Sequence, residues 1–147
     1  MRLKISSVTV CPLCQTQSET VTHLLAQCVT VRSVWARIET RFHIKLPRDS
    51  TKLIHLNFYI ADVDQANTAA VVVSELVHAI WVYRNRVLFD AETVSTLRLI
   101  TSVSTRLRLR VKADYSRMTT ADFEVRWGRY TDAVYVDPVE CKVTVLV

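Results

Sequence analysis

Apolar residues recur at helical spacing along most of this chain of 147 residues. Two long segments, 65–89 and 90–118, and two shorter ones, 20–27 and 30–42, have apolar positions three and four residues apart, which predicts helices. One face of each of the three longer segments is expected to enter the core. The residues expected on these faces are Val31, Val34, Trp35, Ile38, Phe42, Ala69, Val73, Leu76, Ile80, Tyr83, Val87, Leu97, Ile100, Val103, Leu107, Val111, Tyr115 and Met118.

Polar residues mark where the later helices begin. Asp62 or Asp64 can cap the first long helix and Asp90 can cap the second, because their carboxylates accept hydrogen bonds from free backbone N–H groups. Thr119 or Thr120 can cap a last short helix in the same way. The long helices are therefore expected to be separate elements joined by short loops.

The remaining stretches have no helical period. Residues 45–50 read as a loop, and 53–61 fits either a strand or a helix. Weak alternation of β-branched residues predicts a short strand over 5–10, and the tail over 133–147 predicts a terminal strand or a loosely attached end. Gly128 would suit the end of the last helix.

Composition supports a mainly helical fold. Half of the residues are hydrophobic, which is enough to bury a core. The chain has one glycine and three prolines, so the tight turns that hairpin-rich folds need are scarce.

The charge favours polyanion partners. The net charge is +5 and the isoelectric point is about 9.2, which favours RNA or DNA as a partner. An excess of this size can also serve solubility alone.

No membrane partner is expected. The longest apolar run, 69–73, is too short to cross a bilayer, and the first ten residues lack the apolar core of a signal peptide. The expected location is therefore intracellular and reducing, where cysteines tend to bind metals or act in redox chemistry.

Three of the four cysteines and one histidine fall within eighteen positions, in the segment CPLCQTQSETVTHLLAQC. The spacing C-x2-C-x8-H-x4-C, formed by Cys11, Cys14, His23 and Cys28, predicts a tetrahedral Zn²⁺ site. Two alternatives stand beside it. CPLC could be a thioredoxin-type redox pair, but that fold needs alternating strands and helices, and it leaves two of the four residues unused. The four residues could also be unrelated.

The predicted fold class is thus mainly α. A small N-terminal CCHC zinc module with the first helices occupies residues 1–45, and a helical bundle follows over 46–147, with a possible short β segment at the C-terminus. The two parts are expected to form one continuous domain.

The residues around the cysteines resemble the reverse-transcriptase zinc-binding domain at the C-terminal end of non-LTR, LINE-type retrotransposon polyproteins. That family has C-P-x-C, then E-T-x-x-H-L-x-x-x-C, then a helix with Arg before V-W, and further on I-W-x-x-R-N-x-x-x-F. The resemblance covers residues 11 to about 90. The matching residues are Cys11, Pro12, Cys14, Glu19, Thr20, His23, Leu24, Cys28, Arg32, Val34, Trp35, Ile80, Trp81, Arg84, Asn85 and Phe89.

The resemblance implies a non-catalytic part of a larger protein. The chain has no Tyr-x-Asp-Asp polymerase motif, so the expected role is to help an upstream reverse-transcriptase domain bind template RNA or target DNA, in a nuclear or cytoplasmic ribonucleoprotein. Many family members have glycine after the second cysteine, whereas this chain has Gln15. A non-glycine residue with positive φ costs about 1 kcal/mol there, far less than zinc contributes to folding.

Basic residues on the two long helices are the candidate nucleic-acid contacts, and a solvated surface is the alternative interpretation for them. These candidates are Arg84, Arg86, Arg98, Arg106, Arg108, Arg110, Lys112 and Arg117. Trp35, Trp81 and Phe89 could stack on bases, but core packing is the favoured interpretation for all three.

Two other functions stay open. The zinc could simply hold together a structural or protein-interaction module. Glu140 and Lys142 also resemble the E-x-K strand of metal-dependent nucleases, for which Asp132 or Asp137 would have to supply a further carboxylate.

Overall fold

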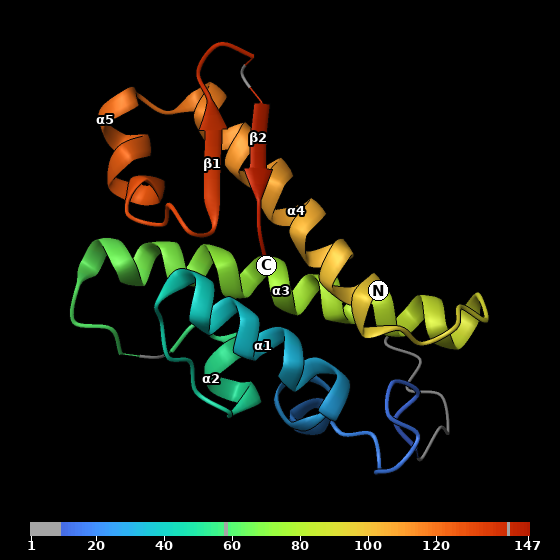
Figure 1. Ribbon diagram of the computed structural model, residues 1–147. Coiled ribbons are helices and arrows are strands. Elements are labelled where there is room, and N and C mark those ends of the chain that lie inside the picture. Colours follow the sequence, from blue (N-terminus) through green and yellow to red (C-terminus); the bar gives the residue numbers. More distant parts are fainter. Residues whose placement is uncertain (1–9, 58, 141) are drawn as a thin grey trace.

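The computed structural model describes residues 10–57, 59–140 and 142–147. It is mainly helical, with one two-stranded antiparallel sheet near the C-terminus (Figure 1). The predicted fold class is therefore confirmed. In chain order the elements are η1 (His23–Gln27), α1 (Val29–Phe42), α2 (Ser50–Ile54), α3 (Val63–Phe89), α4 (Thr96–Arg117), α5 (Thr120–Phe123), η2 (Glu124–Gly128), β1 (Val134–Asp137) and β2 (Lys142–Val145), where η marks a π-helix.

Helix α3 is the central element. In Figure 1 it lies between α1 and α2 on one side and α4 with the strands on the other. Val72, Leu76 and Ile80 are fully buried because neighbours cover α3 on both sides. By length and hydropathy α3 could also cross a bilayer, which corrects the expectation drawn from the run 69–73 alone. Here the middle of its apolar face packs in the protein core, as in an ordinary core helix.

Helix α1 has the predicted inward face. All five of its predicted core residues, including Trp35, are at most 1% exposed. The indole Nε1 of Trp35 donates a hydrogen bond to the backbone oxygen of Leu25 at 2.6 Å, which fixes α1 against η1. The core interpretation of Trp35 is therefore confirmed.

Helix α4 starts later than predicted. Its N-cap is Ser95, not Asp90, and the chain first passes through Ala91 at φ 53°. Tyr83 explains the start, because its hydroxyl accepts a hydrogen bond from Ser95 N at 2.7 Å and donates one to Ser95 O at 3.0 Å. The contact comes from another helix, so the local pattern of polar residues could not reveal it.

The inward face of α4 also differs at its ends. Leu99, Val103, Leu107 and Val111 are fully buried, whereas Leu97 is 71% exposed. The predicted face was thus right in its middle and wrong at Leu97 and at Tyr115, which is 39% exposed. The buried residues of α4 are four positions apart. Because this helix has apolar residues at many positions, its sequence does not decide which row of them faces the core.

The chain ends in a compact C-terminal part. Thr119 caps α5 as predicted, accepting a hydrogen bond from Asp122 N. Gly128 is the last residue of η2, as predicted. Its φ is not positive, so it does not act as a left-handed cap. A buried carboxylate, Asp114, accepts a hydrogen bond from Trp127 Nε1 at 3.1 Å and holds η2 on α4.

The C-terminal β segment is a hairpin that is firmly attached. Val134 pairs with Val145 and Asp137 with Lys142, in antiparallel register. Val143 and Val145 are buried because β2 packs on α4. The predicted terminal strand is confirmed and has a partner strand.

Three further expectations had different outcomes. Among the described residues of the segment 53–61, regular structure is limited to the end of the short helix α2, which is capped by Asp49. Phe89 is 63% exposed, so the core interpretation of this residue is wrong; it is the last residue of α3, beyond the packed part. The predicted strand over 5–10 lies outside the described residues except for Val10, which forms a bridge with Ser18.

The register of α4 can be tested by a pair of substitutions. Leu99→Ala should lower the free energy of unfolding by about 2–5 kcal/mol because it leaves a cavity. Leu97→Ala should change it by less than about 0.5 kcal/mol because Leu97 is mostly exposed. Urea unfolding of both variants measures this, and equal losses would contradict the observed register.

Candidate metal centre

The first two cysteines lie on a tight turn. The backbone N–H of Gln15 donates to Cys11 O at 2.8 Å, and the N–H of Cys11 donates to Gln17 O at 2.8 Å. Gln15 has φ 55°, the left-handed conformation expected where the family has glycine. The turn directs Cys11 and Cys14 toward the same point.

The other two ligands are brought together by the π-helix η1. His23 and Cys28 are five residues apart, which in an α-helix would place them about 140° apart around the axis. In η1 the N–H of Cys28 instead bonds to His23 O at 2.6 Å, an i to i+5 bond that widens the turn. Thr20 caps this segment by accepting a hydrogen bond from His23 N at 2.9 Å.

The four potential ligand atoms form one compact group. They all lie within 4.8 Å of one another. The sulfurs of Cys11 and Cys28 are 3.9 Å apart, and Cys14 Sγ lies 3.4 Å from His23 Nε2. Cys11, His23 and Cys28 are buried and Cys14 is partly buried. The cluster can therefore hold a metal ion with four protein ligands.

The surroundings of Cys28 favour a thiolate. The hydrogen bond from Cys11 lowers the pKa of Cys28 to about 7, with help from the backbone N–H groups of Thr30 and Val31 at the start of α1. The same bond and burial raise the pKa of Cys11. Burial opposes ionisation of Cys14, but hydrogen bonds from Thr16 lower its pKa overall.

The histidine is oriented for binding through Nε2. Its other ring nitrogen, Nδ1, is buried and has no hydrogen-bond partner among the described residues. An imidazole that binds a metal through Nε2 carries its proton on Nδ1. A His23 side chain bound to a metal in this way would carry its proton on Nδ1, for which the described part of the protein offers no acceptor.

A buried ion pair connects the ligand segment, residues 11–28, to the central helix. Arg84 of α3 is 4% exposed, and its Nε and Nη2 both donate to Glu19 Oε1, at 3.0 and 2.7 Å. Arg84 also donates to Asn85 Oδ1 at 3.1 Å. Glu19 and Arg84 belong to the two separate sequence motifs that resemble the retrotransposon family. The structure brings these motifs into direct contact.

Because Arg84 is buried in this pair, it is not placed to contact a nucleic acid. Four more of the eight basic candidates are paired with carboxylates. Arg86 and Arg98 both contact Glu92, Arg106 contacts Glu75, and Arg110 contacts the buried Asp114. Arg106 connects α4 to α3 directly, and Arg86 and Arg98 connect the same helices through Glu92, whereas Arg110 pairs within α4.

The other three candidates are exposed. Arg108, Lys112 and Arg117 lie on α4 and have no ion-pair partner in the part of the chain that the structure describes. They are the candidates best placed to meet an external anion.

The nuclease residues do not assemble. Asp137 Oδ1 accepts hydrogen bonds from the N–H groups of Val139 and Glu140, and Asp132 contacts His43 at 3.4 Å. Among the described residues, the cysteine–histidine cluster is the one group of three or more metal-binding side chains close enough to hold an ion. This arrangement gives the nuclease interpretation no support.

The chain matches no model of a known protein family, no curated protein and no solved structure.

The contribution of the Glu19–Arg84 pair to holding the ligand segment on α3 can be tested by substitution. Arg84→Met should lower the free energy of unfolding by about 3–5 kcal/mol, because it leaves the Glu19 carboxylate buried without a cation. The double variant Glu19→Met/Arg84→Met should recover most of that loss. Denaturant unfolding checks both variants, and a double variant as unstable as the single one would show that the pair does not act through charge.

Proposed function

We propose that this chain is a non-catalytic, zinc-dependent nucleic-acid-binding part of a LINE-type retrotransposon reverse transcriptase. It would help the polymerase domain hold template RNA or target DNA. The observation that carries the proposal is the Cys11, Cys14, His23 and Cys28 cluster, within a sequence context that resembles that family.

Zinc is the metal that suits the donor atoms. Two thiolates about 2.3 Å from a tetrahedral zinc lie about 3.8 Å apart, and the Cys11 and Cys28 sulfurs are separated by 3.9 Å. A thiolate and an imidazole nitrogen would lie about 3.6 Å apart by the same geometry, against 3.4 Å between Cys14 Sγ and His23 Nε2. Three thiolates with one imidazole favour zinc over hard ions such as magnesium.

The ligand set argues for a structural role of the metal. Four protein ligands fill a tetrahedral site, whereas catalytic zinc keeps one position for water or substrate. Bound zinc would join the turn around Cys11 to the start of α1 through Cys28, the N-cap of that helix.

Nucleic-acid binding is supported by three observations together. The chain has a net charge of +5. Arg108, Lys112 and Arg117 are exposed on one helix. The Glu19 and Arg84 motifs, which are distant in sequence, meet in one buried contact, as parts of a shared family core would.

A structural or protein-interaction module is the second candidate. It is favoured by the pairing of Arg86, Arg98, Arg106 and Arg110 with carboxylates, because paired arginines contribute less to attraction of a polyanion. The two candidates differ in their response to salt, since binding to phosphates weakens as salt increases.

The metal prediction is that purified protein carries about one zinc ion per chain. His23→Ala should remove one ligand and lower hydrogen-exchange protection over residues 11–42, while α3 and α4 keep most of theirs because their buried faces pack on each other. Elemental analysis and hydrogen exchange measure the two effects. His78→Ala, on the surface of α3, is the matched control and should change neither. Metal-free protein with unchanged exchange would reject the zinc site.

The function prediction concerns salt. The wild-type chain should bind single-stranded RNA or DNA, and log K should fall linearly with log salt at a slope of about −0.7 for each phosphate contact. Fluorescence anisotropy over a range of salt concentrations gives the slope. An absence of binding at low salt would favour the protein-interaction module instead.

A further inference from the structure

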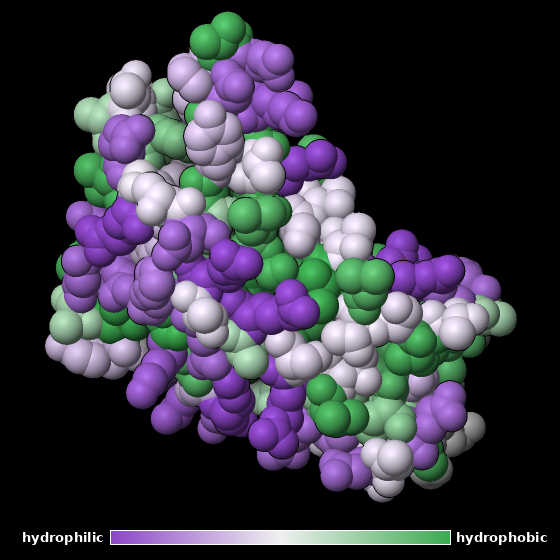
Figure 2. All heavy atoms as spheres, in the orientation of Figure 1, coloured by the Kyte–Doolittle hydropathy of each residue, from purple (hydrophilic) through white to green (hydrophobic). Residues whose placement is uncertain are grey.

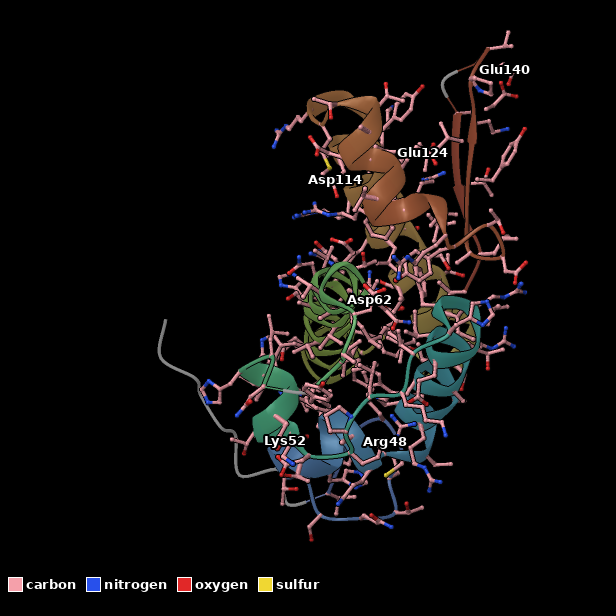
Figure 3. All side chains as sticks on the ribbon, turned by 90° about the vertical axis from the view of Figure 1, so that its left-hand side faces the viewer. Arg48, Lys52, Asp62, Asp114, Glu124 and Glu140 are labelled. Carbon is pink, nitrogen blue, oxygen red and sulfur yellow. The ribbon has the colours of Figure 1, made fainter. Side chains whose placement is uncertain are left out.

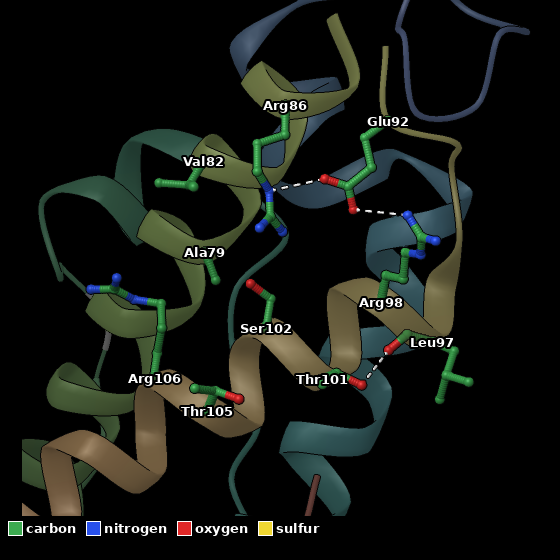
Figure 4. A pocket seen from close by; sticks show the side chains of 10 residues that line it. All are labelled: Ala79, Val82, Arg86, Glu92, Leu97, Arg98, Thr101, Ser102, Thr105 and Arg106. Atoms are coloured by element: carbon green, nitrogen blue, oxygen red, sulfur yellow. Dashed lines mark hydrogen bonds and ion pairs between the residues drawn. The ribbon is translucent and has the colours of Figure 1, made fainter. Parts of the chain in front are cut away.

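Two grooves run along opposite flanks of α4, and both contain basic residues. The first, of about 490 Å³, lies between α3 and α4 (Figure 4). The second, of about 270 Å³, lies between α4 and β2. Thr101 and Thr105 line both, so the grooves meet across one ridge of the helix. Their charges are nevertheless very different.

The larger groove is already neutralised from within. Glu92 lies between Arg86 and Arg98, with its carboxylate oxygens 3.1 and 3.5 Å from their nitrogens (Figure 4). The third arginine of the groove, Arg106, is 2.8 Å from Glu75. A phosphate entering here would have to compete with two carboxylates for three guanidinium groups. The negative charge of the carboxylates would also repel it.

The smaller groove has cations without a carboxylate among its lining residues. Arg108 reaches it from α4 and Lys142 from β2, so two elements far apart in sequence supply the charge. Both side chains are exposed and neither has an ion pair within the described ranges. Positive charge from two sides of one groove creates a local preference for anions.

Hydroxyl-bearing residues line the same groove. Ser104 and Thr105 come from α4 and Thr144 from β2, and no side-chain hydrogen bond engages these hydroxyls in the described part of the protein. In Figure 2 the flank of α4 beside β2 is pale, the colour of weakly polar residues. Serine and threonine hydroxyls, with arginine and lysine, are common partners of nucleic-acid phosphates.

Asp137, the residue opposite Lys142 in the hairpin, uses its carboxylate in the turn. Asp137 pairs with Lys142 in register, but its Oδ1 accepts hydrogen bonds from Val139 N at 2.8 Å and Glu140 N at 3.0 Å. These bonds, more than Lys142, lower the pKa of Asp137. Lys142 lines the groove and has no ion-pair partner in the described part of the chain.

We propose that the groove between α4 and β2 binds the phosphate backbone of single-stranded nucleic acid through Arg108 and Lys142. This proposal rests on the nucleic-acid-binding function proposed above and adds where the strand lies. Lys112 is one turn beyond Arg108, about 6 Å along the helix, so the positive charge continues in a line past the groove. A line of cations suits a polymer that carries charge at regular intervals.

The experiment uses the full chain loaded with zinc and a fluorescent oligouridylate as the probe. The double variant Arg108→Gln/Lys142→Gln removes both groove cations. The control, Lys45→Gln/Lys52→Gln, removes two exposed positive charges at and before α2. Figure 3 shows Lys52 at the opposite end of the molecule from Glu140, which lies beside β2. Because both variants have the same net charge, a difference in their affinity for the probe must come from where the removed charges lie on the protein.

The groove variant should lose two phosphate contacts. Its salt slope should be shallower by about 1.4, and its affinity at 0.1 M salt should fall about 25-fold, whereas the control should lose little. All four substituted residues are exposed, so thermal unfolding midpoints should match the wild type.

The alternative outcomes are distinct. If the wild type binds the probe and the groove and control variants weaken equally, the groove proposal is wrong and the proposed function stands. If the wild type does not bind at low salt, the proposed function fails and the groove proposal fails with it. If polyglutamate competes as well as oligouridylate and shows the same loss in the groove variant, the groove binds acidic protein segments, which overturns the proposal.

Discussion

The arrangement of this protein depends on one buried contact between charges, Glu19 with Arg84. It joins the ligand segment to α3, the helix on which the rest of the bundle packs. The two hydrogen bonds that Arg84 donates to Glu19 both go to Oε1, and Oε2 is buried without a partner among the described residues. A pair that is desolvated and incompletely bonded adds little net stability. Its effect is to specify which part of α3 the ligand segment must meet.

The ligand segment itself depends on a compromise between sequence spacing and helix geometry. His23 and Cys28 can face one point only because η1 adopts the wider π turn, and such turns are uncommon and often occur at functional sites. Bound metal would compensate for that turn with bonds that an ordinary helix could not form. The metal site thus gives a reason for the π turn, and the π turn gives the metal site its geometry. Neither the helical period of the sequence nor the number of cysteines predicts this combination.

The sequence predicted what local patterns determine. Ligand spacing identified Cys11, Cys14, His23 and Cys28, and apolar period identified α1 and α3. The sequence-based prediction was wrong where a residue far along the chain determines the structure. The start of α4 is an example, because Tyr83 fixes it through hydrogen bonds to Ser95. The roles predicted for the arginines were wrong for the same reason. A long arginine side chain reaches its carboxylate partner only when the helices have packed together, and the sequence does not show which helices pack. Arg84 and Arg106 have partners 65 and 31 residues away in the chain.

The fold decides which of the basic residues are free to attract an anion. Arginines at similar spacing on α4 look equivalent in sequence, but the fold divides them between two flanks. On the flank toward α3, the carboxylates of Glu75 and Glu92 neutralise them and so allow two helices to approach closely. On the flank toward β2 no lining residue is acidic, and the hairpin adds Lys142, which sequence reasoning had assigned only to a nuclease motif. The net charge of +5 is therefore a poor guide to where an anion would bind, and the pairing of each cation in the fold is a better one.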